Sequence, residues 1–310
     1  MNRLSTAPLL LLACVEQGID ETAVIDADTG ADVDTDTTDD DSDLVPGTDI
    51  ETDTAPFVST CDATATSVDC PYTTVRVDPG LGFATRDVHV ATPLGTPPTD
   101  GWPAVLFFQG SLFSAELSFT GTDGAPFGQF HLARTVQSLL DEGFVVIAPE
   151  VLAGGSTFWQ TNIPPFSVAW QGSSDDRLMG QIFDEIDNNG LFGPIDSASM
   201  YATGISSGGF MSSRMAVSYP GRFRALAIHS AGYATCSAVC LMPRSLPDDH
   251  PPTLFVHGLT DLIVPPRVMT QYRDALEDDG VEVDVLIGDR EGHEWMAEAA
   301  TAIPDWFLAH

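Results

Sequence analysis

The chain has 310 residues, of which 45 are Asp or Glu and 12 are Lys or Arg, so its formal net charge at pH 7 is −33. Such an acidic excess leaves no basic patch able to displace counterions from phosphates, and it argues against nucleic-acid binding. The length is sufficient for one domain with a substantial hydrophobic core in addition to an extended N-terminal region.

The N-terminus predicts export from the cytoplasm. Residues 1–12 hold one arginine and a short apolar run, and Leu11-Leu12-Ala13-Cys14 is similar to the lipobox of bacterial lipoproteins. We interpret residues 1–14 as a signal peptide with a lipidated Cys14, and a cleaved secretory signal without lipid is the alternative. Val15 is not the aspartate that retains lipoproteins at the inner membrane. The resemblance therefore implies an outer-membrane or cell-surface position, with membrane contact only through this lipid.

Residues 15–55 predict a disordered acidic linker. They contain fifteen Asp or Glu, no Lys or Arg, and few side chains that could build a core. The alternate spacing of Asp32, Asp34 and Asp36 suggests calcium binding as a second interpretation. The glycine and the terminal glutamate of a calcium loop are missing, however, so we favour a solvated tether and expect no metal.

Residues 56–310 predict one α/β domain. An antiparallel portion is expected at 73–77 and 86–91, where the second segment alternates apolar and polar residues. Strands and helices then alternate, which predicts a mainly parallel sheet covered on both faces. The expected strands are 104–108, 144–148, 199–205, 225–229, 253–257 and 281–287, and the expected helices are 127–141, 174–188, 207–219, 266–278 and 294–308.

A nucleophile-elbow pattern occurs where one of these strands turns into a helix. The sequence Gly204-Ile205-Ser206-Ser207-Gly208 follows a short apolar run, and helical spacing follows it. A serine on such a tight turn needs small residues two positions before and after it. The pattern therefore predicts Ser206 as a nucleophile.

Two further segments supply an acid and a base in the chain order of an α/β-hydrolase. Asp261 follows an apolar strand that breaks at Gly258, and His293 follows the alternating strand over 281–287. The three residues follow the carboxyl ends of parallel strands, which meet at one edge of a sheet. We expect His293 to take the proton of Ser206 and Asp261 to orient the imidazole.

The negative charge that develops on the substrate oxygen needs hydrogen-bond donors. We expect one from the backbone N–H of Ser207 and a second from the loop after strand 104–108, at the N–H of Ser111. That loop carries Gln109-Gly110 where many lipases have His-Gly.

Four cysteines remain apart from Cys14, and an even number in an exported chain predicts disulfides. Local pairing is the simplest of three connectivities, and the close pairs are Cys61 with Cys70 and Cys236 with Cys240. Metal binding by the second pair is the alternative. No histidine lies near that pair at zinc spacing.

From about Pro103 onward the chain resembles extracellular esterases of the poly(3-hydroxybutyrate) depolymerase and feruloyl or acetylxylan esterase type. The segments that carry the resemblance are 195–204, 206–211, 257–265 and Gly292-His293-x-Trp295. The resemblance implies an α/β-hydrolase that needs no cofactor, is secreted, and cleaves esters of polymers or phenolic acids. We also expect a monomer.

Three residues near the predicted site are candidate substrate contacts. Gln109, Trp159 and Trp295 are expected to contact the substrate, but either tryptophan could instead pack its loop onto the domain. His229 and His257 stand among apolar residues at strand ends and are expected to be core histidines.

Three functions remain open at this point. The first is a serine carboxylic ester hydrolase. The second is a serine peptidase of the prolyl oligopeptidase type, which shares the elbow and the acid-to-histidine order but usually carries a large propeller domain. The third is a non-catalytic surface lipoprotein with a hydrolase fold.

Overall fold

The computed structural model describes residues 59–151, 158–236, 240 and 242–310. The predicted signal peptide with Cys14 and the predicted linker over 15–55 lie outside the described residues, so both stay predictions. No helix in the described part of the chain is long and apolar enough to cross a membrane.

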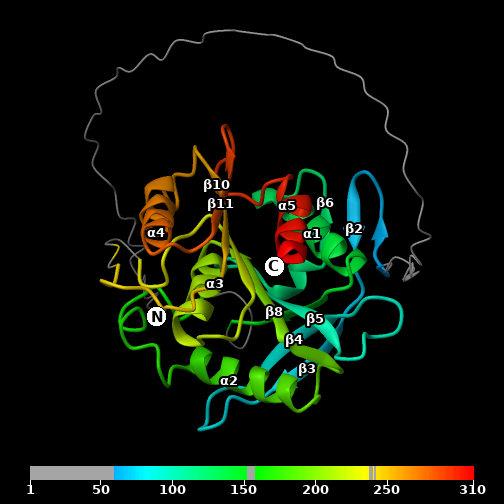
Figure 1. Cartoon of the computed structure of the whole chain (residues 1–310). Helices are drawn as coiled ribbons and strands as arrows, with labels where there is room; N and C mark the ends of the chain where they lie inside the picture. Colours follow the sequence, from blue (N-terminus) through cyan, green and yellow to red (C-terminus); the bar gives the residue numbers. More distant parts are fainter. Residues whose placement is uncertain (1–58, 152–157, 237–239, 241) are drawn as a thin grey trace, which may run out of the picture. The chain divides into compact units, whose positions relative to one another are not determined.

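An eight-stranded sheet with the order β11-β10-β9-β8-β5-β7-β4-β3 forms the centre of the domain (Figure 1). The strands from β11 to β7 pair in parallel, whereas β4 is antiparallel to both β7 and β3. This confirms the predicted antiparallel portion followed by a parallel sheet. The strands are β3 (Thr73–Val77), β4 (Arg86–Ala91), β5 (Trp102–Phe108), β7 (Val145–Pro149), β8 (Ile195–Ile205), β9 (Ala225–His229), β10 (Thr253–Gly258) and β11 (Val283–Gly288).

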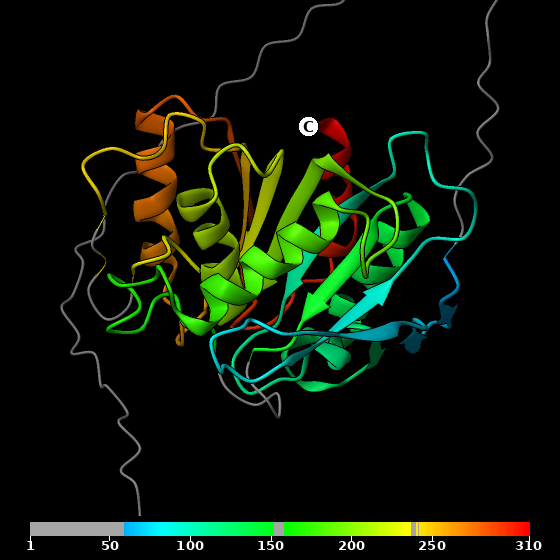
Figure 2. The ribbon, with the colours of Figure 1, turned by 90° about the horizontal axis from the view of Figure 1, so that it is seen from below.

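Two hydrophobic cores lie on the two faces of this sheet. Alternate residues of a strand point to opposite faces, and in β5 Leu106 belongs to one core while Phe107 belongs to the other. The first core includes α2 (Ser174–Asp187), α3 (Ser207–Ser218) and α4 (Pro266–Asp278). The second includes α1 (Gln129–Asp141) and α5 (Ala299–Ala309), which pack against each other. The sheet is thus covered on both faces, as the turned view in Figure 2 also shows.

Two predicted helices begin later than expected. The helix predicted over 294–308 is α5, which begins at Ala299, because residues 294–298 form the loop that leads away from His293. The helix predicted over 127–141 is α1, which begins at Gln129. Phe127 and Gly128, within the short 3-10 turn η2 (Pro126–Gly128), have positive φ values of 59° and 69°, which interrupts helical geometry before α1 begins.

A small second sheet was not predicted from the sequence. It has the order β1-β2-β6 and consists of β1 (Asp62–Ala63), β2 (Ser67–Asp69) and β6 (Thr120–Thr122), which pair in antiparallel fashion. Strands of two or three residues leave no readable periodicity, which explains the omission. The Cys61–Cys70 disulfide closes the β1–β2 hairpin, and Cys236 is bonded to Cys240, so the structure contains both local pairs.

Candidate active site

Ser206 lies on a strained turn between β8 and α3. Its φ of 57° and ψ of −121° are rare for a residue with a side chain. A Cβ atom at Gly204 or Gly208 would collide with the carbonyl oxygen of Phe108. Both glycines of the elbow pattern are therefore required by the close approach of β5, and the turn presents the serine beyond the end of the strand.

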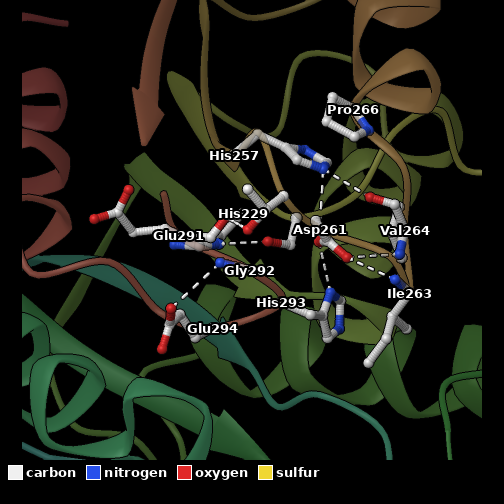
Figure 3. Close-up of polar contacts among 12 residues, drawn as sticks. His229, His257, Asp261, Ile263, Val264, Pro266, Glu291, Gly292, His293 and Glu294 are labelled. Carbon is white, nitrogen blue, oxygen red and sulfur yellow. Dashed lines mark hydrogen bonds and ion pairs between the residues drawn. The ribbon is translucent and has the colours of Figure 1, made fainter. Parts of the chain in front are cut away.

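Asp261 and His293 come from the loops after β10 and β11 and point toward each other (Figure 3). The Nδ1 atom of His293 lies 2.7 Å from Oδ2 of Asp261. Two neighbouring strands of a parallel sheet place their following loops at the same edge, which brings together residues that are 32 positions apart. The predicted acid–imidazole pair is therefore formed in this structure.

The Asp261 carboxylate is buried and fully oriented. Its Oδ1 atom accepts hydrogen bonds from the backbone N–H groups of Ile263 at 2.9 Å and Val264 at 2.8 Å. Burial raises the pKa of the Asp261 carboxyl, but the hydrogen bonds from His293, Val264 and Ile263 outweigh it and hold that pKa below its ordinary value. The carboxylate thus stays charged beside the imidazole at neutral pH.

Ser206 and His293 line one pocket of about 360 Å³. Among the described residues, the hydrogen bonds of the His293 ring include the bond to Asp261 but none to Ser206. Such bonds are often long in hydrolases without substrate and shorten when substrate binds. The pocket is lined by Gln109, Gly110, Ser111, Leu112, Phe113, Ser114, Leu117, Ser118, Pro126, Phe127, Gln129, Leu132, Ile205, Ser206, Ile263 and His293.

The predicted oxyanion donors come from two segments, the start of α3 and the loop after β5. Ser207 is the first residue of α3, where the backbone N–H groups of a helix have no intrahelical partner. Ser111 lies in the pocket lining after β5, together with Gln109. The amide of Gln109 donates to the carbonyl oxygen of Phe113 and so braces this loop from inside.

Both tryptophans that we expected at the substrate are completely buried and do not line the pocket. Trp159 donates its indole N–H to the carbonyl oxygen of Gln109 at 3.2 Å, and its backbone N–H donates to Oγ of Ser207 at 2.9 Å. Its ring also packs edge-on against Phe108. The structure therefore places Trp159 behind the site, where it supports the loop and the elbow.

Trp295 has a comparable supporting position. Its indole N–H donates to Oγ1 of Thr135 in α1 at 2.8 Å, and its ring stacks between Phe107 and His229. These contacts anchor the loop that carries His293. For both tryptophans the structure favours the packing interpretation over the predicted substrate contact.

His229 and His257 are neutral core histidines that hold the two catalytic loops. The Nε2 atom of His257 donates to the carbonyl oxygen of Val264 at 2.8 Å and lies 3.6 Å from Oδ2 of Asp261. The Nε2 atom of His229 accepts the backbone N–H of Met296 at 3.0 Å. Burial lowers the pKa of both imidazoles, so both rings are uncharged at neutral pH.

The apolar walls of the pocket are not predicted from the sequence. Leu112, Phe113, Leu117, Phe127 and Ile263 line it, and three of these (Leu112, Phe127 and Ile263) are also exposed to solvent. A run of large apolar residues directly after the oxyanion loop, in a segment with no strand or helix pattern, was the available signal. The part of the pocket beside the serine is therefore largely apolar.

Comparisons with known proteins identify relatives of this chain. The chain is 46% identical over 244 residues to a poly(3-hydroxyoctanoate) depolymerase from Pseudomonas fluorescens, which covers 78% of this chain and 86% of that protein. Residues 229–309 match the prolyl oligopeptidase family.

Solved structures share the fold at low sequence identity. A thermostable esterase matches with a TM-score of 0.55 at 17% identity, over 77% of this chain and 62% of the esterase. An acylaminoacyl peptidase from Pyrococcus horikoshii matches with a TM-score of 0.52 at 14% identity, over 77% of this chain and 41% of the peptidase. This chain thus spans less than two thirds of either protein.

The fold and the relatives together define an α/β-hydrolase that acts as a carboxylic ester hydrolase. Within that class, the chain belongs to the family of the poly(3-hydroxyoctanoate) depolymerase.

Proposed function

We propose that this protein is an exported serine polyesterase that cleaves aliphatic polyesters with apolar side groups. Ser206 is the nucleophile, His293 the general base and acid, and Asp261 the orienting carboxylate. The observation that carries the proposal is the apolar pocket that Ser206 and His293 both line, with His293 hydrogen-bonded to Asp261. The named substrate of the Pseudomonas relative supports the polyester assignment.

The reaction follows from the position of each group. Oγ of Ser206 attacks the ester carbonyl carbon while Nε2 of His293 removes the hydroxyl proton, because Nδ1 of His293 is occupied by Asp261. The N–H groups of Ser207 and Ser111 stabilise the oxyanion. His293 then returns the proton to the leaving alcohol, and a water molecule activated by the same imidazole hydrolyses the acyl-enzyme.

Export through residues 1–14 is part of this proposal. A solid polyester outside the cell cannot enter it, so a hydrolase that degrades such material has to act outside. The two disulfides are consistent with an oxidising compartment. Globomycin treatment and palmitate labelling of cells that express the full chain test whether Cys14 is lipidated, with a Cys14→Ser variant as the control.

The direct test is turbidity clearing with suspensions of poly(3-hydroxyoctanoate) and poly(3-hydroxybutyrate), next to feruloylated and acetylated xylan. We expect the wild-type protein to clear the polyester with the longer side chain. The Ser206→Ala variant should clear neither polyester and should resist labelling by a fluorophosphonate. Clearing by Ser206→Ala would contradict the nucleophile assignment, and a wild-type protein that the probe does not label would favour the non-catalytic alternative.

Amide hydrolysis is the second candidate activity, because residues 229–309, which include Asp261 and His293, match the prolyl oligopeptidase family. We expect the purified protein to cleave p-nitrophenyl esters and to leave matched p-nitroanilides intact. Comparable turnover of ester and anilide would replace the polyesterase by a peptidase.

A further inference from the structure

One side of the pocket is an irregular segment that needs an external anchor. Residues 109–118, which we call the pocket wall, supply half of the residues that line the pocket. The only regular element that reaches into the wall is the short 3-10 helix η1 (Ala115–Ser118), and Leu112 has a positive φ of 71°. A loop of this kind holds its shape only if other parts of the chain fix it.

Glu150, the residue directly after β7, makes that connection. Its Oε1 atom accepts a hydrogen bond from the hydroxyl of Ser114 and another, at 2.9 Å, from the backbone N–H of Ala115. These two donors open η1, so the carboxylate caps this helix from a position just after β7, 35 residues away in sequence. The contact joins the middle of the pocket wall to the end of the central sheet.

Glu150 is itself firmly placed by β4. Its backbone N–H donates to the carbonyl oxygen of Asp87 at 3.0 Å, and the buried guanidinium of Arg86 lies within hydrogen-bond reach of its carbonyl oxygen, at 3.5 Å. The Nε2 atom of His89 lies 3.4 Å from Oε1 of Glu150. The hydroxyl of Thr74 is hydrogen-bonded to Nδ1, the other ring nitrogen of His89. Glu150 lies one residue beyond β7, and residues of β4 in the central sheet hold both its backbone and its side chain.

The carboxylate of Glu150 is charged in this environment. Burial raises the pKa of the Glu150 carboxyl, but the hydrogen bonds from His89, Ser114 and Ala115 outweigh it and keep that pKa below its ordinary value. Glu150 is 9% exposed, and its second oxygen, Oε2, has no hydrogen-bond partner among the described residues. A buried charge is costly unless it is paired, and here the compensating hydrogen bonds include those from the two residues that open η1.

We propose that Glu150 is a positioning residue that sets the fit of the apolar part of the ester substrate through the pocket wall. The wall carries Leu112, Phe113 and Leu117, which face the same pocket as Ser206. When the cap at Ser114 and Ala115 is lost, these side chains move relative to the serine. The kcat/KM for esters that fill the pocket then falls more than the kcat/KM for esters that do not. This inference rests on the proposed function, because it assumes that esters react at Ser206.

The test compares the hydrolysis of p-nitrophenyl octanoate and p-nitrophenyl acetate by the full chain. In Glu150→Ala we expect kcat/KM for octanoate to fall about tenfold more than kcat/KM for acetate, mainly through KM, because only the longer chain contacts the wall. Glu150→Gln keeps an oxygen that can accept both hydrogen bonds, so it should restore most of the octanoate activity. The matched control is Glu116→Gln, which alters an exposed carboxylate in the same turn and should leave the ratio unchanged.

Ser114→Ala provides a milder variant in case Glu150→Ala does not fold. It removes one of the two capping donors, and we expect the octanoate-to-acetate ratio to fall about threefold, which is a typical loss for one hydrogen bond. Equal losses on both esters in Glu150→Ala, or an unchanged ratio in Ser114→Ala, would overturn the proposal. Failure of the proposed function is distinguishable, because Ser206→Ala would then retain acetate hydrolysis whatever the ratio in the Glu150 variants.

Discussion

Replacement of Asp261 by asparagine is the most informative single perturbation of the site. In the wild-type protein Oδ1 of Asp261 accepts the N–H groups of Ile263 and Val264, and Oδ2 faces Nδ1 of His293. An asparagine must keep its only carbonyl oxygen toward the two backbone donors. Its amide nitrogen then occupies the position of Oδ2 and donates a hydrogen bond toward His293.

This reversal places the imidazole in the wrong tautomer. Nδ1 of His293 has to accept the amide hydrogen, so the ring proton moves to Nε2, where the proton of Ser206 should arrive. Triads with this change lose about 10⁴-fold in kcat, which corresponds to about 5 kcal/mol of transition-state stabilisation. The loss of negative charge beside the imidazolium acts in the same direction.

Steady-state hydrolysis of p-nitrophenyl octanoate measures the effect, and we expect KM to change little because Asp261 does not line the pocket. Asp289→Asn is the matched control, since Asp289 is an exposed carboxylate just after β11. A kcat for Asp261→Asn within about tenfold of the wild-type value would refute the assignment of Asp261 to the triad.

Two further predictions concern stability. Trp295→Phe removes the bond to the buried Oγ1 of Thr135 and should lower the free energy of unfolding in urea by about 1–3 kcal/mol with an unchanged KM. A higher KM at unchanged stability in this variant would instead support a substrate contact for Trp295. The carboxyl groups of Glu150 and Asp261 have folded-state pKa values below their ordinary ones, so their stabilising contribution is complete above about pH 5 and is lost as the pH falls through the lowered values. Urea midpoints should therefore fall from about pH 5 to pH 3, and less steeply in Glu150→Gln; equal slopes in the two proteins would contradict this reasoning.

Much of the fold was predictable because its signals are local. The strands over 225–229 and 73–77 and the helix over 266–278 have the predicted bounds, since each carries a clear apolar period or a strong end signal. Other boundaries moved where long-range contacts decided them. The strand predicted at 199–205 begins at Ile195, because its first residue pairs with Trp102 of β5.

The candidate site divides in the same way. Motifs at strand ends predict the three triad residues, Ser206, Asp261 and His293. In the structure a hydrogen bond joins His293 to Asp261, and His293 lines the same pocket as Ser206. The pocket wall and its anchor were not predicted, because Glu150 reads in the sequence only as one acidic residue after a strand. Nothing local connects it to Ser114.

The sequence by itself determined the order of the central strands and helices and the nucleophile elbow, and it favoured the local cysteine pairs, because each depends on residues a few positions apart. Only the tertiary structure decided which loop side chains meet the substrate and which lie in the core. Trp295 is buried because Thr135, 160 residues earlier, receives its indole N–H, whereas Leu112 and Ile263 lie open at the pocket. The direction of a loop side chain depends on distant packing partners, and no local period in the chain encodes them.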